Sequence, residues 1–90
     1  MYVVAHTVSV NDRSAAKAGL EQVVPHVSGL PGFVAGYWTE RSDNQGLALI
    51  VFDSRETAQD FADFLKPAPD AAGVTPDREG IGVCEVLAYA

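Results

Sequence analysis

The chain has 90 residues, the length of one small domain, and we treat residues 1–90 as a single domain. Twelve acidic against six basic side chains give a net charge of −6. This balance argues against nucleic acid or an anionic membrane surface as a partner, because both require clustered Lys and Arg. The single cysteine, Cys84, excludes an internal disulfide, and no apolar run approaches the ~20 residues that span a bilayer. We therefore expect a cytoplasmic protein.

The first predicted strand runs from Tyr2 to Val10 and is apolar and β-branched on both parities, which is typical of a strand buried on both faces. Its even-numbered side chains, His6 among them, point one way and its odd-numbered side chains the other. Ser14 to Val27 has apolar residues at helical spacing and predicts a helix, with Asn11-Asp12 as its cap. Pro25 predicts a kink or a restart late in this helix.

Two further strands are predicted from Phe33 to Glu40 and from Leu47 to Asp53, joined by a polar hairpin loop over residues 41–46. Gly36, in the middle of the first of these strands, indicates an edge, a bulge or a close approach of the backbone. The second strand is apolar throughout, which predicts a central position in the sheet.

A second helix is predicted from Arg55 to Lys66, because apolar residues recur there at helical spacing. Asp53 and Glu56 have the spacing of a capping box with Asp53 as the cap. Pro67 to Asp77 contains three prolines and predicts a loop, either a passive connection or a mobile lid over a pocket. Glu79 to Tyr89 predicts the last strand, at an edge of the sheet.

The resulting order, β-α-β-β-α-β, predicts an α+β ferredoxin-like fold. We expect a four-stranded antiparallel sheet of order 4-1-3-2 with two helices on one face. Since the first and third strands are apolar on both parities, the helix-free face then exposes a large apolar surface. A homodimer that packs two such faces together removes this surface from water. The alternative is a cleft on this face for a different partner.

Two segments carry a resemblance to a known family. Gly-Leu-Pro-Gly-Phe-Val-Ala-Gly-Tyr at 29–37 and Leu-Ala-Leu-Ile-Val-Phe-Asp-Ser-Arg-Glu-Thr-Ala at 47–58, together with the order and length, resemble the dimeric α/β-barrel superfamily, and within it the antibiotic biosynthesis monooxygenase-like proteins. The resemblance implies a dimer whose two sheets form a barrel, with a ligand pocket between sheet and helices in each subunit. It implies a cofactor-independent monooxygenase acting on aromatic or other hydrophobic small molecules. A non-catalytic, stress-related or ligand-binding dimer is the alternative.

The haem-degrading branch of this superfamily places an Asn on the first strand, a Trp at the end of the third strand and a His on or after the second helix. The nearest matching positions here hold His6 and Phe52, and residues 55–77 contain no histidine. Haem degradation by that scheme is therefore not expected, and we predict no bound cofactor and no metal.

His6 is the best candidate for a catalytic residue, because an imidazole among valines could bind a substrate oxygen or act as a base. The competing interpretation is a core histidine satisfied by a neighbouring polar group. The parity of Tyr37 places it on the helix side of the sheet. Tyr37 and Phe52 are predicted to line the pocket together with His6. Trp38, on the opposite parity, is expected in packing or in the dimer contact. His26 suits the end of a helix without any ligand.

Overall fold

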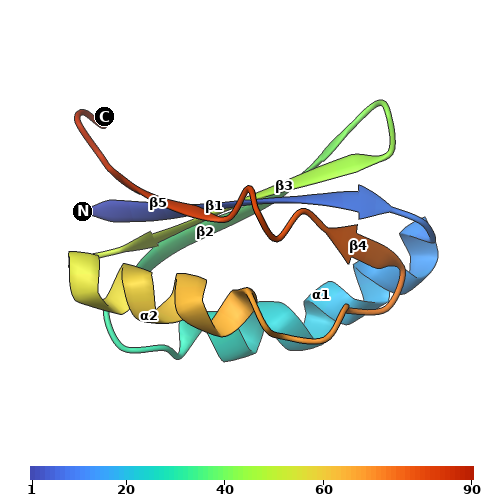
Figure 1. The fold of residues 1–90 in the computed structure, drawn as a ribbon, viewed down its shortest axis with the longest axis horizontal. Helices are drawn as coiled ribbons and strands as arrows, with labels where there is room; N and C mark the ends of the chain where they lie inside the picture. The colour runs from blue at the N-terminus through green and yellow to red at the C-terminus, as the bar shows by residue number, and fades with distance from the viewer.

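The computed structural model describes residues 1–90 and contains five strands and two helices (Figure 1). The elements in chain order are β1 (Tyr2–Val10), α1 (Arg13–Ser28), β2 (Phe33–Arg41), β3 (Gln45–Phe52), α2 (Arg55–Leu65), β4 (Val74–Pro76) and β5 (Gly82–Glu85). All strand pairs are antiparallel. The α+β ferredoxin-like fold predicted from the sequence is confirmed.

The strands form one sheet of order β2-β3-β1-β4, in which β5 also pairs with β1. β5 runs beside the first half of β1, where Val83 lies opposite Val4. β4 runs beside the end of β1, where Pro76 lies opposite Val8. Because β4 and β5 occupy the same edge, the order agrees with the predicted 4-1-3-2, and β1 and β3 are central as expected.

The last strand is not continuous, and the prediction of one strand from Glu79 to Tyr89 is wrong. Only Gly82–Glu85 pairs there, while β4 lies inside the segment predicted as a loop. A turn separates the two strands: the N–H of Gly80 donates to the backbone oxygen of Asp77 and to its Oδ1, both at 3.2 Å. Pro76, which has no N–H to donate, ends β4 before this turn.

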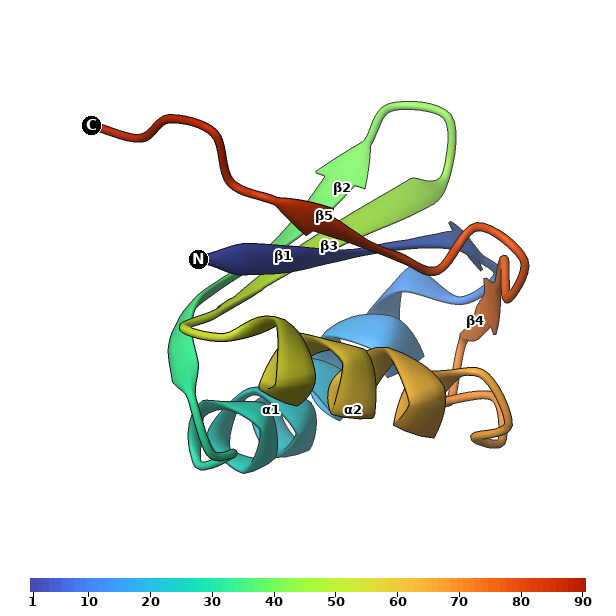
Figure 2. The ribbon, with the colours of Figure 1, turned by 60° about the vertical axis from the view of Figure 1, so that its left-hand side comes forward.

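The chain beyond β5 leaves the sheet. The N–H of Val86 still donates to the backbone oxygen of Met1 at 2.9 Å, but no strand follows. Figure 2 shows the C-terminal segment projecting beyond the sheet on the side away from the helices. Leu87 is 89% exposed and Tyr89 is 81% exposed, so this apolar segment has almost no cover within one chain.

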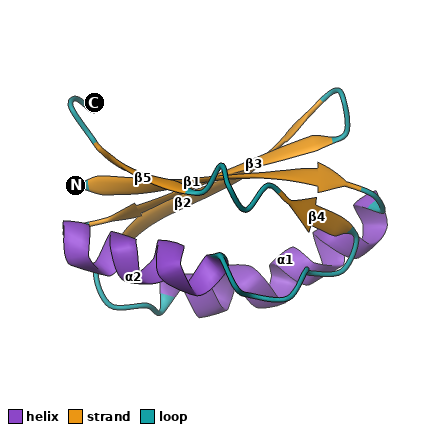
Figure 3. Ribbon diagram, in the orientation of Figure 1, coloured by secondary structure: helices purple, strands orange, loops and turns teal.

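Both helices lie on the same face of the sheet (Figure 3). α1 begins after Asp12, whose Oδ1 accepts a hydrogen bond from the N–H of Ala15 at 3.1 Å, and continues through Pro25 without a restart. α2 is capped by Ser54 and not by Asp53 as predicted. The Oγ of Ser54 accepts a hydrogen bond from the N–H of Thr57 at 3.2 Å, and this side-chain acceptor satisfies one free donor of the first turn.

The hydrophobic core lies between α2 and the sheet and is centred on Phe52, which is 1% exposed. Its ring meets Phe33 edge-on at 6.4 Å between centroids and Phe61 at 5.5 Å. Burying a side chain of this size stabilises the fold by about 1.5–3 kcal/mol. α1 contributes one residue to the core, whose members are Val4, Val27, Ile50, Phe52, Ala58, Phe61, Ala62 and Ile81.

A bulge at Val34 changes the parity of β2. Phe33 lies opposite Phe52, but Ala35 lies opposite Val51, so Val34 is an extra residue in the pairing. Residues after the bulge are therefore turned to the other face relative to an unbroken strand. As a result, Tyr37 lies on the helix-free face and Trp38 on the helix side, the reverse of the prediction.

Gly36 lies beneath the indole of Trp38. A Cβ added at Gly36 would lie 2.8 Å from Cη2 and Cζ3 of that ring, which is too close for either group to stay in place. We expect Gly36→Ala to displace the indole and to lower the free energy of unfolding by about 1–3 kcal/mol. Trp38 is the only tryptophan, so a shift of the fluorescence emission and a urea melt measure both effects.

Gly82→Ala is the matched control, because Gly82 also lies in a strand, β5, and nothing lies within 4 Å of a Cβ added there. The control variant should keep the wild-type emission. An unchanged emission and midpoint in Gly36→Ala would contradict the close approach.

Candidate functional site

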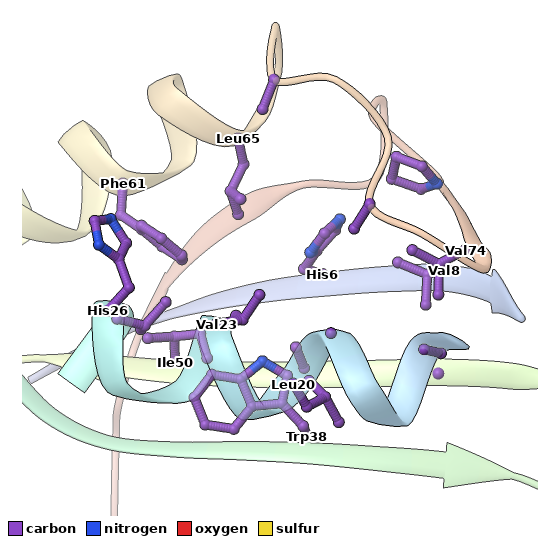
Figure 4. A pocket seen from close by; sticks show the side chains of 18 of the residues that line it. His6, Val8, Leu20, Val23, His26, Trp38, Ile50, Phe61, Leu65 and Val74 are labelled. Atoms are coloured by element: carbon purple, nitrogen blue, oxygen red, sulfur yellow. The ribbon is translucent and has the colours of Figure 1, made fainter. Parts of the chain in front are cut away.

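A cavity of about 980 Å³ lies between the sheet and the two helices. Its size is at the upper end of the range of small-molecule sites, about 300–1,000 Å³. Figure 4 shows side chains reaching it from the sheet, from both helices and from the segment near Val74. Most of the wall is apolar, and Val8, Leu20, Ile50 and Phe61 are among the residues that form it.

The cavity exists because small residues face one another across the space under α1. Ala16 and Gly19 line it from the helix, and Gly46 and Ala48 line it from β3. Val27 is the one residue of α1 that is fully buried, at the far end of the helix. Leu20 and Val23 line the space from α1 (Figure 4).

His6 lines this cavity from the middle of β1, opposite Ala48 in the sheet. Its Nε2 atom is closed off from solvent and has no hydrogen-bond partner. Figure 4 shows the ring projecting from β1 toward the loop that joins Leu65 to Val74. An unpaired buried polar atom costs about 1–3 kcal/mol. No neighbouring protein group bonds to Nε2, in contrast to what a satisfied core histidine, the alternative interpretation from the sequence, requires.

Arg78 lines the same cavity as His6 and is close enough for its charge to act on the imidazole. Its Nη1 donates to the backbone oxygens of Leu65 at 3.3 Å and Lys66 at 2.9 Å, and its Nη2 pairs with the carboxylate of Asp70. These bonds tie the end of α2 and the following loop to the turn after β4. The three hydrogen bonds of Arg78 use Nη1 and Nη2 and leave Nε without a partner. Arg78 is also one of the residues that line the cavity.

Sequence reasoning did not identify Arg78 as a site residue. A lone arginine after a proline-rich segment has no motif or spacing that distinguishes it from a solvated charge. The position of Arg78 follows only from the fold. The N–H of Asp77 donates to the backbone oxygen of Thr7 at 2.9 Å, so Arg78 follows a residue that is bonded to β1 directly after His6.

Burial lowers the pKa of His6 below its usual value of 6.5, and the positive charge of Arg78 lowers this pKa further. The negative charge of Asp77 acts in the opposite direction and is the weakest of the three effects. His6 is therefore neutral at pH 7, with one ring nitrogen able to accept a proton.

Of the predicted pocket residues, His6 and Phe52 line the cavity and Tyr37 does not. Tyr37 is 59% exposed and borders a shallow apolar hollow on the helix-free face. Trp38 takes the place predicted for Tyr37 and forms an aromatic part of the wall beneath α1 (Figure 4). The bulge at Val34 is the cause of this exchange.

His26 lines the cavity near Phe61, apart from His6 along the sheet (Figure 4). No three His, Cys, Asp or Glu side chains are grouped so that they could hold a metal ion. Neither helix has both the length and the apolar character needed to cross a membrane. No model of a known protein family and no curated protein matches the sequence of this chain.

The lowered pKa of His6 predicts how stability depends on pH. Well above pH 6.5 the imidazole is neutral in both the folded and the unfolded chain and contributes no pH dependence. As the pH falls through 6.5, the unfolded chain binds a proton before the folded chain does, so folding stability is lost. We expect urea melts between pH 7.5 and pH 5.5 to show a smaller loss for His6→Gln than for the wild type.

The two proteins carry the same carboxylates, so any contribution from these groups cancels in this comparison. His26→Gln controls for the loss of an exposed imidazole. Equal pH slopes for the wild type and His6→Gln would show that the His6 pKa is not lowered by folding.

Proposed function

We propose that this protein binds an aromatic or other hydrophobic small molecule in the cavity and oxidises it with molecular oxygen, without a bound cofactor. The observation that supports the proposal is the unpaired Nε2 of His6 at the wall of a large apolar cavity. A ligand oxygen or an acidic C–H placed there gives this atom a partner. Trp38 and Phe61 supply aromatic surfaces that favour a planar ligand.

In the proposed reaction, neutral His6 accepts a proton from an activated CH2 group of an electron-rich substrate such as a hydroxylated anthrone. The resulting carbanion passes its electrons to O2. One oxygen atom ends in the new C=O group, and the other leaves as water with the two hydrogens of the CH2 group. The lowered pKa of His6 keeps the imidazole in the basic, neutral form near pH 7.

Access to His6 involves the loop between α2 and β4. This loop contributes Ala68, Pro69, Ala71 and Ala72 to the cavity wall, and Nε2 is sealed from solvent in the closed arrangement. We propose that the loop acts as a lid that shifts to admit the ligand. Its bonds to Arg78 return it to the closed position, which excludes water during the reaction.

The second candidate function is ligand binding without catalysis. The observation that favours it is the absence of any hydrogen-bonded carboxylate that would orient the His6 ring, as a catalytic base usually requires. In both cases we propose a cytoplasmic location, where the single thiol of Cys84 stays reduced.

Oxygen uptake with a hydroxylated anthrone tests the enzymatic proposal. We expect turnover above the spontaneous rate, and a drop of about 100-fold or more in His6→Gln, because a positioned base contributes about 10²–10⁴-fold. Ligand affinity should change only a few-fold. Thr7→Val is the matched control, since Thr7 is the next residue of β1 and lies on the opposite face of the sheet.

A 10,10-dimethyl anthrone keeps the ring system but has no proton for His6 to remove. If it binds and the parent compound also binds without oxygen uptake, the protein is a ligand-binding protein. If neither compound binds, the cavity is not a site for this class of molecule.

We further propose that two copies pack together through their helix-free sheet faces. In support, this face carries a hollow lined by eight apolar or aromatic residues, and Val34 and Tyr37 are exposed there. The apolar C-terminal segment extends on the same side (Figure 2). A contiguous apolar surface of this kind is unusual on a monomer.

Light scattering tests the dimer, with twice the 9.5 kDa mass of one chain as the expected result at micromolar concentration. Tyr37→Glu should dissociate it, because an unpaired carboxylate is costly in an apolar interface. Phe64→Glu is the matched control: Phe64 is 60% exposed, like Tyr37, but lies on α2 over the opposite face. A wild-type mass of one chain would refute the dimer.

A further inference from the structure

The charges around the cavity are opposite in balance to those of the whole chain. The chain has twelve acidic and six basic side chains. Only two acidic residues line the cavity, Glu40 and Asp60. Three basic residues and both histidines line it as well: Arg13, Lys17, Arg78, His6 and His26. A predominantly acidic protein has therefore gathered half of its Lys and Arg side chains around one apolar space.

Two of these lining charges form an ion pair with each other, so the excess positive charge of the wall lies elsewhere. Nε of Arg13 and Oε1 of Glu40 form an ion pair at 2.7 Å. Neither Asp60, on α2, nor Lys17, on α1, has an ion-pair partner, so these two lining charges are opposite and equal in number. Arg78 is the remaining basic residue of the wall. Arg78 lines the cavity and is paired with Asp70, which does not line it, so the counter-ion of this arginine lies outside the cavity wall.

The geometry points to a hydrophobic organic anion as the ligand, an aromatic ring system whose ionised oxygen lies at the corner formed by His6 and Arg78. This inference rests on the proposed use of the cavity as a small-molecule site. The oxygen accepts a hydrogen bond from the unpaired Nε2 of His6 in the tautomer that carries its proton there, while the positive charge of Arg78 stabilises the anion. The CH2 substrate of the proposed oxidation uses the other neutral tautomer, in which Nε2 accepts a proton. The rings extend toward Trp38 and Phe61 along the apolar wall.

Asp70 competes with such a ligand for Arg78. In the structure the Asp70 carboxylate already holds Nη2, so a bound anion interacts with a partly neutralised guanidinium. Removing the charge of Asp70 while keeping Arg78 should therefore strengthen the binding of an anion. A loosened loop would change the affinity for a neutral ligand of the same shape as well, so a rise that is specific to the anion makes this variant a stringent test.

The experiment compares 2-naphthoate with 2-naphthamide, which have the same rings and differ in the charge, by titration calorimetry at pH 7.5 and low salt. We expect the acid to bind about tenfold more tightly than the amide. Arg78→Gln should abolish this preference, and Asp70→Asn should increase the affinity for the acid by at least about twofold. Arg41→Gln, an arginine of the exposed hairpin, should leave both affinities unchanged.

Each outcome separates the inference from the proposed function. Equal binding of acid and amide overturns the anion site and leaves a neutral-ligand cavity. Failure of both to bind counts against the small-molecule site itself. A preference for the acid that survives Arg78→Gln, or an affinity that falls in Asp70→Asn, overturns the assignment of the anion to the His6–Arg78 corner. Circular dichroism of each variant checks that a loss of binding is not a loss of fold.

Discussion

The unequal way in which the two helices cover one face of the sheet governs the rest of the structure. α2 buries Ala58, Phe61 and Ala62 against β1 and β3 and completes a dense core around Phe52. α1 is fastened at its buried end by Val27, while Ala16 and Gly19 leave space above the sheet. Stability is therefore concentrated on the α2 side, and the α1 side is free to hold a ligand. A packed core beneath both helices would exclude the cavity.

Period-two and helical patterns of apolar residues in the sequence were sufficient to predict most of the fold. β1 and β3 are central because they are apolar on both parities, and the even-numbered side chains of β1, including Val4 and His6, lie under the helices as the alternation requires. The alternation fails in β2, because one extra residue at Val34 turns every later side chain to the other face. Nothing in the local sequence except Gly36 indicated this bulge.

The cavity itself could be predicted only in part. The candidate His6 follows from its strand position, and Phe52 follows from the end of an apolar strand. The free volume depends on which small residues of α1 and β3 face one another, and single-sequence patterns do not contain this pairing. Arg78 depends on a contact between segments more than ten residues apart in the chain, because its partners are the carbonyl groups that end α2.

The division of the last strand is what gives the apolar cavity its polar corner. A continuous strand from residue 74 to residue 85 would keep residues 77–81 on the edge of the sheet. Instead, the break after Pro76 and the turn closed by Asp77 and Gly80 carry Arg78 across to the end of α2. The same guanidinium then bonds to the loop after α2, which lines the cavity together with His6, and contributes to the lowered pKa of that residue. One irregularity at the sheet edge thus places a single arginine where it both holds the loop after α2 and lowers the pKa of a side chain in the cavity wall.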